Sequence, residues 1–168
     1  MHKLIIAAAC ALAISGAHAQ EPKQVGSWLV NTEKDRFTDD INIIAATLNN
    51  GGVLAVRCLS PGRVVTIAIR HPQLVKDLTP GERFAVQYKG GKGPVLLTLA
   101  EAVGSDMLEV FVSKAMRPTL LTADEYAFRF RAPNEQFDVI FSAGTASKAL
   151  PPVLNACPPK EDDKEQGK

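Results

Sequence analysis

The feature that most constrains this fold is a succession of short apolar segments separated by turn residues. The clearest pair covers residues 41–48 and 53–59, and the tetrapeptide Asn49-Asn50-Gly51-Gly52 separates them. Asparagine and glycine tolerate the positive φ angles that tight hairpin turns require, so this segment is predicted to be a β-hairpin. Because similar segments recur at short and fairly even spacing, we predict a mainly β domain, an antiparallel β-sandwich or barrel.

The other predicted strands follow the same pattern. One of them alternates, with Phe128 and Phe130 on one face and Arg129 and Arg131 on the other. Such alternation is typical of a sheet with one buried and one exposed face. These strands are predicted over residues 26–30, 64–70, 83–89, 95–101, 126–131 and 137–141.

Two helical segments are expected beside the strands. Residues 105–122 fit either a helix or a strand followed by a short helical connection near Pro118, and we favour the second interpretation. A final helix, capped by Thr145 or Ser147, is predicted to run through Ala156. The Pro151-Pro152 pair within it should split or kink the helix, because proline lacks the backbone N–H that continues a helix.

The amino terminus has the three parts of a secretory signal peptide. His2 and Lys3 begin it, residues 4–14 are apolar, and Ala17-His18-Ala19 supplies small residues at a cleavage site before Gln20. The apolar run is too short to span a bilayer, which takes about 20 residues. A buried helix is one alternative, and a lipoprotein signal with modification of Cys10 is another. We expect a periplasmic or secreted protein without stable membrane insertion.

Length and charge limit the remaining possibilities. Removal of the 19 signal residues from 168 leaves 149, which suits one domain, predicted over residues 20–157. Residues 158–168 are mostly charged and are predicted to be disordered. Without Lys3, the 19 basic residues fall to 18 against 18 acidic ones. A neutral chain with scattered basic residues argues against a nucleic-acid partner.

The two cysteines of the mature chain are predicted to pair. Cys58 and Cys157 remain after signal cleavage, and an exported protein enters an oxidising compartment in which cysteine thiols form disulfides. The alternative role, a catalytic thiol, requires a base, and His71 is the only histidine left after cleavage. The oxidising compartment and the even number of cysteines favour the structural disulfide.

Catalytic and metal-binding motifs are mostly missing from the sequence. After the predicted signal cleavage no pair of histidines remains to hold a transition metal, and we expect no cofactor. Acidic or basic residues with possible functional roles are Asp39, Asp40, His71 and Asp124. Adjacent carboxylates can serve as acid and base or hold calcium, although such pairs usually lie in solvated loops. Trp28, the single tryptophan, is expected to anchor the core.

Several of these motifs have a counterpart in a known family. The Gly26-x-Trp28-x-Val30 motif, the Asp39-Asp40 pair and Leu54-x-Val56-x-Cys58 resemble the start of small periplasmic accessory proteins of type VI secretion, the VasI/TagO-like group. The C-terminal half is similar as well, through Tyr126-x-Phe128-x-Phe130 and a short helix that closes on Cys157. The resemblance implies the same disulfide and a role without a defined active site.

Three classes of function fit these observations. The first is a non-enzymatic periplasmic accessory or binding module of the cell envelope, with an envelope protein as its partner. The resemblance implies a link of this module to type VI secretion. The second is an envelope hydrolase of peptidoglycan or an ester. The third is a small inhibitor of a hydrolase, acting through a protruding loop. We favour the first, because no catalytic constellation is recognisable.

Overall fold

Among the residues that the computed structural model describes, ten strands form one antiparallel sheet. The structure describes residues 21–34, 37–49, 51–72, 74, 78–131 and 136–159. The predicted signal peptide, its cleavage site and residues 160–168 of the predicted disordered tail lie outside these ranges. The strand order in the sheet is β1-β2-β3-β4-β5-β8-β7-β6-β9-β10. The strands are β1 (Lys23–Val25), β2 (Trp28–Lys34), β3 (Ile41–Asn49), β4 (Gly52–Leu59), β5 (Val64–Arg70), β6 (Arg83–Gly90), β7 (Val95–Ala102), β8 (Leu108–Phe111), β9 (Glu125–Arg131) and β10 (Gln136–Ser142).

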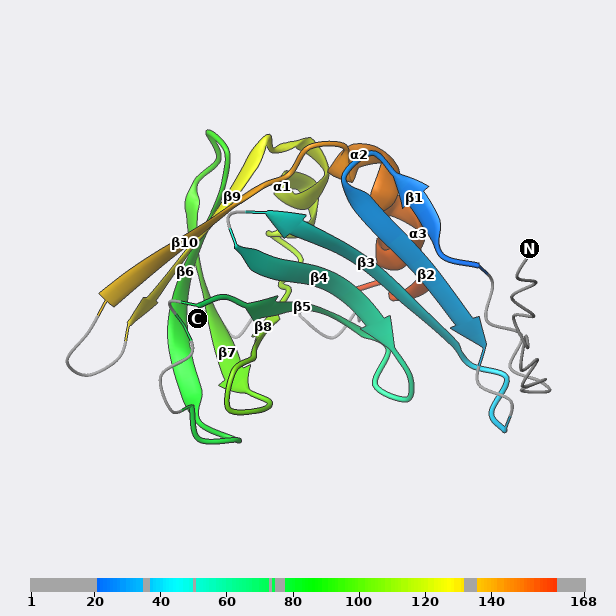
Figure 1. The fold of residues 1–168 in the computed structure, drawn as a ribbon, viewed down its shortest axis with the longest axis horizontal. Helices are drawn as coiled ribbons and strands as arrows, with labels where there is room; N and C mark the ends of the chain where they lie inside the picture. The colour runs from blue at the N-terminus through cyan, green and yellow to red at the C-terminus, as the bar shows by residue number, and fades with distance from the viewer. Residues whose placement is uncertain are drawn as a thin grey trace, which may run out of the picture.

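The sheet bends so that its two halves face each other. In Figure 1, strands β2 to β5 form one wall and strands β6, β7, β9 and β10 form the other. Alternate residues of both walls point inward and form one apolar core. The mainly β, antiparallel prediction is confirmed, with the refinement that a single folded sheet, rather than two separate ones or a closed barrel, supplies both layers.

The predicted hairpin is present, because β3 pairs with β4 across a turn that contains Gly51. Strands β6 and β7 form a second hairpin across residues 91–94. The first predicted strand is wrong in detail, because Gly26 and Ser27 form the turn of a β1–β2 hairpin instead of opening a strand. Gly26 has a φ of 61°, in the left-handed region where glycine is favoured, so the chain turns there.

The segment from residue 105 to residue 122 follows the favoured interpretation. Strand β8 (Leu108–Phe111) is followed by the short helix α1 (Arg117–Thr122), which has Pro118 in its first turn. The predicted C-terminal helix is divided into α2 (Ala146–Ala149) and α3 (Pro151–Ala156), and α3 begins at the proline pair. Thr145 precedes α2 but makes no cap, because its hydroxyl donates to the carbonyl oxygen of Val25 at 2.8 Å.

Helices α2 and α3 cover the inner side of the first wall, whereas α1 contacts α2 and β6. Helix α2 contacts β2, and α3 contacts β3 and β4, as Figure 1 also shows. The predicted disulfide is present and joins Cys58 in β4 to Cys157 directly after α3, with the two Cα atoms 5.7 Å apart. Trp28 is fully buried as expected, and its indole N–H donates to the carbonyl oxygen of Ala143 at 2.8 Å.

One side chain links the two halves of the sheet. The amide of Asn49, at the end of β3, donates to the carbonyl oxygen of Ser142 at 3.3 Å and accepts from its N–H at 3.1 Å. Ser142 is the last residue of β10, which is the edge strand of the sheet. The Asn49 amide therefore forms hydrogen bonds with the backbone N–H and carbonyl that a further strand would otherwise pair with. No helix within the described ranges is long and apolar enough to cross a membrane.

Candidate binding face

The outer side of strand β7 carries a continuous apolar strip. Val95, Leu97 and Leu99 occupy successive outward positions, and Leu97 is 75 % exposed. Phe111 extends the strip onto β8, because it follows Val110, which pairs with Ala100 next to Leu99, and because it too is exposed. We call these four residues the apolar strip. Exposed apolar residues are ordinary when isolated, but a contiguous group on one sheet face is typical of an interaction site.

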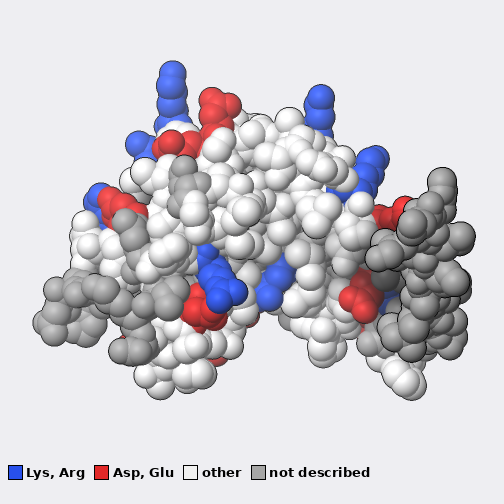
Figure 2. Space-filling view, viewed as in Figure 1, with Lys and Arg blue, Asp and Glu red and all other residues white. Residues whose placement is uncertain are grey.

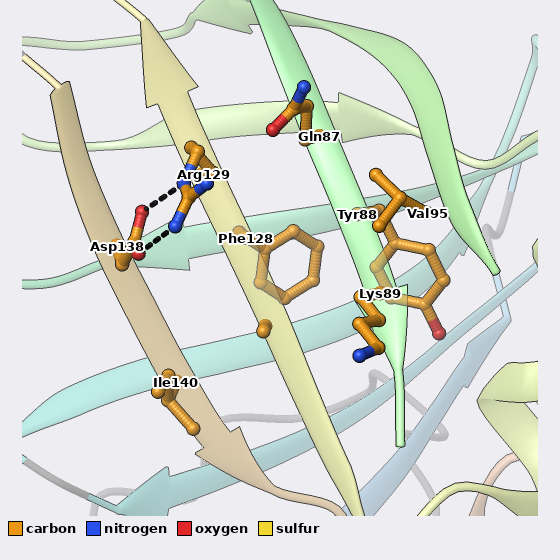
Figure 3. A pocket seen from close by; sticks show the side chains of 9 residues that line it. Gln87, Tyr88, Lys89, Val95, Phe128, Arg129, Asp138 and Ile140 are labelled. Carbon is orange, nitrogen blue, oxygen red and sulfur yellow. Dashed lines mark hydrogen bonds and ion pairs between the residues drawn. The ribbon is translucent and has the colours of Figure 1, made fainter. Parts of the chain in front are cut away.

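A shallow hollow of about 290 Å³ opens next to the strip. Strand register explains its shape, because Val95, Lys89, Ala127 and Ile140 form one outward row across β7, β6, β9 and β10. The alanine in this row has a short side chain between longer neighbours, so its position forms part of the floor. Figure 3 shows Lys89 on β6 and Ile140 on β10, on opposite sides of β9.

An ion pair stands beside the hollow in the next row. Arg129 of β9 donates to both carboxylate oxygens of Asp138 in β10, at 2.8 and 2.7 Å, as the dashed lines in Figure 3 mark. The hydrogen bonds lower the pKa of Asp138 below its usual range and raise that of Arg129. Both side chains are nearly half exposed, so the pair orients two polar groups on the surface but adds little to stability.

The lining of this hollow combines polar and aromatic side chains. Its polar lining consists of Gln87, Lys89, Arg129 and Asp138, together with the buried Tyr88. The phenol of Tyr88 turns inward, lies 3.0 Å from the Thr119 hydroxyl, and has its pKa raised by burial to about 12. A nucleophile held next to a base would be the mark of covalent catalysis, and these lining residues supply no such pair.

The charged surface around these features is mixed. Figure 2 shows Lys and Arg side chains interspersed with Asp and Glu around the rim of one face, while uncharged surface covers much of its middle. On the candidate face, Lys89 and Arg131 form no ion pair with another described residue. The strip is therefore bordered by positive charge as well as by the Arg129–Asp138 pair.

The four residues singled out from the sequence do not meet. Asp39 and Asp40 precede β3, where Asp39 pairs with Lys34 at 2.6 Å and Asp40 accepts from the Ser60 hydroxyl at 2.5 Å. That hydroxyl, helped by Thr38, lowers the pKa of Asp40. His71 instead lies beside Gly52, at the far end of the β3–β4 hairpin, so a strand of nine residues, about 27 Å long, separates it from Asp40.

The remaining candidates have structural surroundings. His71 is buried with its ring edge-on to Phe141, 6.2 Å between centroids. Asp124 precedes β9 with an exposed side chain, and its backbone carbonyl accepts from Ala143. Within the described part of the chain, no three His, Cys, Asp or Glu residues come together in a way that could hold a metal ion.

Sequence reasoning missed the apolar strip, although the strand that forms it carries a signal. Residues 95–99 read Val-Leu-Leu-Thr-Leu, which places leucine on both faces of a strand. A strand at the surface of a folded sheet needs only one apolar face, so the second face either packs against another layer or remains exposed for a partner. The choice between these two depends on the tertiary structure.

Comparison with known proteins adds no relative. No family model, curated protein or solved structure matches this chain significantly.

Proposed function

We propose that this protein is a non-enzymatic binding module of the cell envelope that holds a protein partner on its apolar strip. The observation that carries the proposal is the exposure of Val95, Leu97, Leu99 and Phe111 on one contiguous face. Burial of one such side chain contributes about 1.5–3 kcal/mol, so four of them supply a sizeable driving force before the costs of association.

The arrangement around the strip supports a protein rather than a small molecule as the partner. The hollow beside it is shallow and open, and its floor is a strand surface, whereas small-molecule sites usually enclose most of their ligand. The Arg129–Asp138 pair and Lys89 stand at its border, as polar groups do at the rim of a protein interface. An apolar centre with charged borders is the pattern that this proposal requires.

The cellular location in the proposal comes from the sequence. The signal-peptide pattern of residues 1–19 and the Cys58–Cys157 disulfide both favour an oxidising compartment. The resemblance to accessory proteins of type VI secretion points to a secretion-linked partner in the periplasm. The hydrolase alternative is less favoured, since the candidate residues Asp40 and His71 lie at opposite ends of one hairpin.

Site-specific photo-crosslinking in the cell tests the proposal. A photoreactive amino acid is placed at Leu97, and the matched control carries it at Leu48, which is 72 % exposed on β3 in the other half of the sheet. We expect a discrete crosslinked protein at position 97 and none at position 48. The Leu99→Asp substitution in the first variant should remove the product, because it places a charge in the middle of the strip.

The cellular phenotype and the protein abundance of further variants complete the test. Alanine substitutions at Asp39, Asp40, His71 and Asp124, made one at a time, should leave the cellular phenotype of the gene nearly intact, whereas Leu97→Asp should abolish it at normal protein level. An abundant and folded alanine variant without function would reject the proposal in favour of catalysis, since loss of one catalytic group typically costs a hundredfold or more, about 3 kcal/mol of barrier. Equal crosslinking at positions 97 and 48 would also reject it.

A further inference from the structure

A second hollow, separate from the one beside the strip, gathers three basic side chains. It measures about 170 Å³ and lies where β5 begins and where the chain leaves β8 for α1. Arg63, Lys114 and Arg117 contribute to its lining. Among the described residues, none of the three forms an ion pair with an acidic side chain. The cations therefore converge on one hollow without a salt-bridge partner in the part of the chain that the structure describes.

Arg117 is the best positioned of the three. Its guanidinium donates to the carbonyl oxygens of Leu154 at 3.1 Å and of Cys157 at 2.6 Å. These two acceptors are neutral, and partial burial already lowers the pKa of the group. A guanidinium has five N–H donors, so the two carbonyls leave donors available for an anion in the hollow. Arginine also presents these donors in a planar fork that fits a carboxylate.

The other two cations are exposed and can adjust to a ligand. Arg63 has a φ of 48°, a left-handed conformation that residues other than glycine adopt infrequently, in the turn between β4 and β5. Asp40 lies near enough to Arg63 to interact with it electrostatically. Even when that acidic charge is counted against Arg63, Lys114 and Arg117 leave the hollow positive.

The apolar part of the lining narrows the class of anion. Val64, Val112, Pro158 and Pro159 form much of the rest of the hollow. A bare inorganic anion would use the cations and leave these side chains uncovered, whereas an anion with a short apolar group would cover both. The volume corresponds to about six molecules of liquid water, enough for a carboxylate and a few carbon atoms. We propose that this hollow binds the carboxylate of a small organic anion that carries a short branched apolar group.

The disulfide holds one side of this site in place. Cys157 is tied to β4, its carbonyl oxygen accepts from Arg117, and Pro158 and Pro159 follow it directly. The position of the two prolines and of the guanidinium is thus fixed relative to β5, which pairs with β4. The site is independent of the apolar strip, so its existence and the proposed function can fail separately.

Calorimetric titration of the purified, oxidised protein with N-acetylvaline at neutral pH and low ionic strength tests the proposal. N-acetylvalinamide, which has the same apolar group without the carboxylate, should bind at least tenfold more weakly. The Lys114→Gln substitution should weaken N-acetylvaline binding about tenfold, as expected for loss of one charge-assisted contact. The matched control Lys92→Gln removes another exposed lysine, in the β6–β7 turn, and should leave affinity unchanged.

A variant of Arg117 separates charge from geometry. Arg117→Lys keeps the charge but loses the planar fork, so affinity should fall while thermal unfolding reports whether the fold is retained. The absence of binding at about 10 mM N-acetylvaline, or equal binding of the acid and the amide, would overturn the proposal. Inorganic phosphate that binds as tightly as N-acetylvaline would overturn the assigned ligand class, because the apolar lining would then contribute nothing.

Discussion

The contact between the β1–β2 turn and the start of α2 can be tested with one methyl group. A Cβ atom added to Gly26 would lie 2.1 Å from the hydroxyl oxygen of Thr145 and 2.8 Å from its methyl carbon. Gly26 also has a φ of 61°. The Gly26→Ala substitution therefore combines a strained backbone, about 1–2 kcal/mol, with overpacking, about 1–3 kcal/mol. The loss of chain freedom in the unfolded state returns about 0.4–1 kcal/mol. The expected net loss of unfolding free energy is about 1–4.5 kcal/mol, with a central value of about 3 kcal/mol.

Gly51→Ala is the matched control. Gly51 has a φ of 76°, but nothing lies within 4 Å of a Cβ atom added there. Its substitution should cost about 1 kcal/mol from the backbone alone. Urea unfolding followed by far-UV circular dichroism measures both variants, and a net loss of about 3 kcal/mol lowers the midpoint by about 1.5 M when the slope is about 2 kcal/mol per M.

A double-mutant cycle assigns the difference to the contact itself. Thr145→Ala removes the hydroxyl and the methyl group that obstruct the new Cβ atom, at the cost of the hydrogen bond to Val25, about 1 kcal/mol. The two substitutions together should then destabilise the protein by about 1–2 kcal/mol less than their sum. Equal effects of Gly26→Ala and Gly51→Ala, or strict additivity with Thr145→Ala, would refute the proposed packing of this turn.

Three further predictions concern the disulfide and titrating groups. Replacement of Cys58 and Cys157 by alanine should lower the unfolding free energy, as measured by urea unfolding, by about 4–5 kcal/mol, since the bond closes a loop with a separation of 99 residues. Thiol labelling of the denatured, oxidised protein should find no free thiol. Burial raises the pKa of Tyr88 to about 12, so absorbance of the native protein near pH 10 should show no ionisation of this tyrosine. The unfolding free energy that its neutral form contributes should decline as pH rises from about 10 toward 12. Hydrogen bonding to Ser60 lowers the pKa of Asp40, so the stability from this bond is present above the unfolded pKa of about 4 and is lost as pH falls through the native pKa. In an NMR titration, Ser60→Ala should raise the pKa of Asp40.

The two proposed sites would use different properties of the same scaffold. The apolar strip depends on the outward face of β7, whereas the basic hollow depends on the β4–β5 turn and on the segment after α3. A partner could engage the strip whether or not the hollow holds an anion. Measurement of the crosslink at Leu97 with and without N-acetylvaline would show whether the two sites influence each other.

Local sequence determined most of the secondary structure. The turn at residues 49–52 and the alternation of residues 126–131 predicted their strands correctly, because turn chemistry and the two-residue period of a strand act over a few neighbouring residues. The pairing of Cys58 with Cys157 was also predictable, since only two cysteines remain after the predicted signal cleavage. Gly26 was placed in a strand incorrectly, because its contact with Thr145 is made by residues far away in the chain.

Only the tertiary structure decided which faces became surface. The Val-Leu-Leu-Thr-Leu run of β7 places leucine on both faces, and nothing in those five residues indicates that Leu97 is exposed. The order of strands across the sheet determines it, because β7 lies between β8 and β6 with its outer face uncovered by α1, α2 or α3. Arg63, Lys114 and Arg117 likewise meet because β5 pairs with β8, and the disulfide brings the segment after α3 to the same place. Contacts between residues so distant in sequence leave no local pattern, so hydrophobic periodicity and residue spacing cannot reveal them.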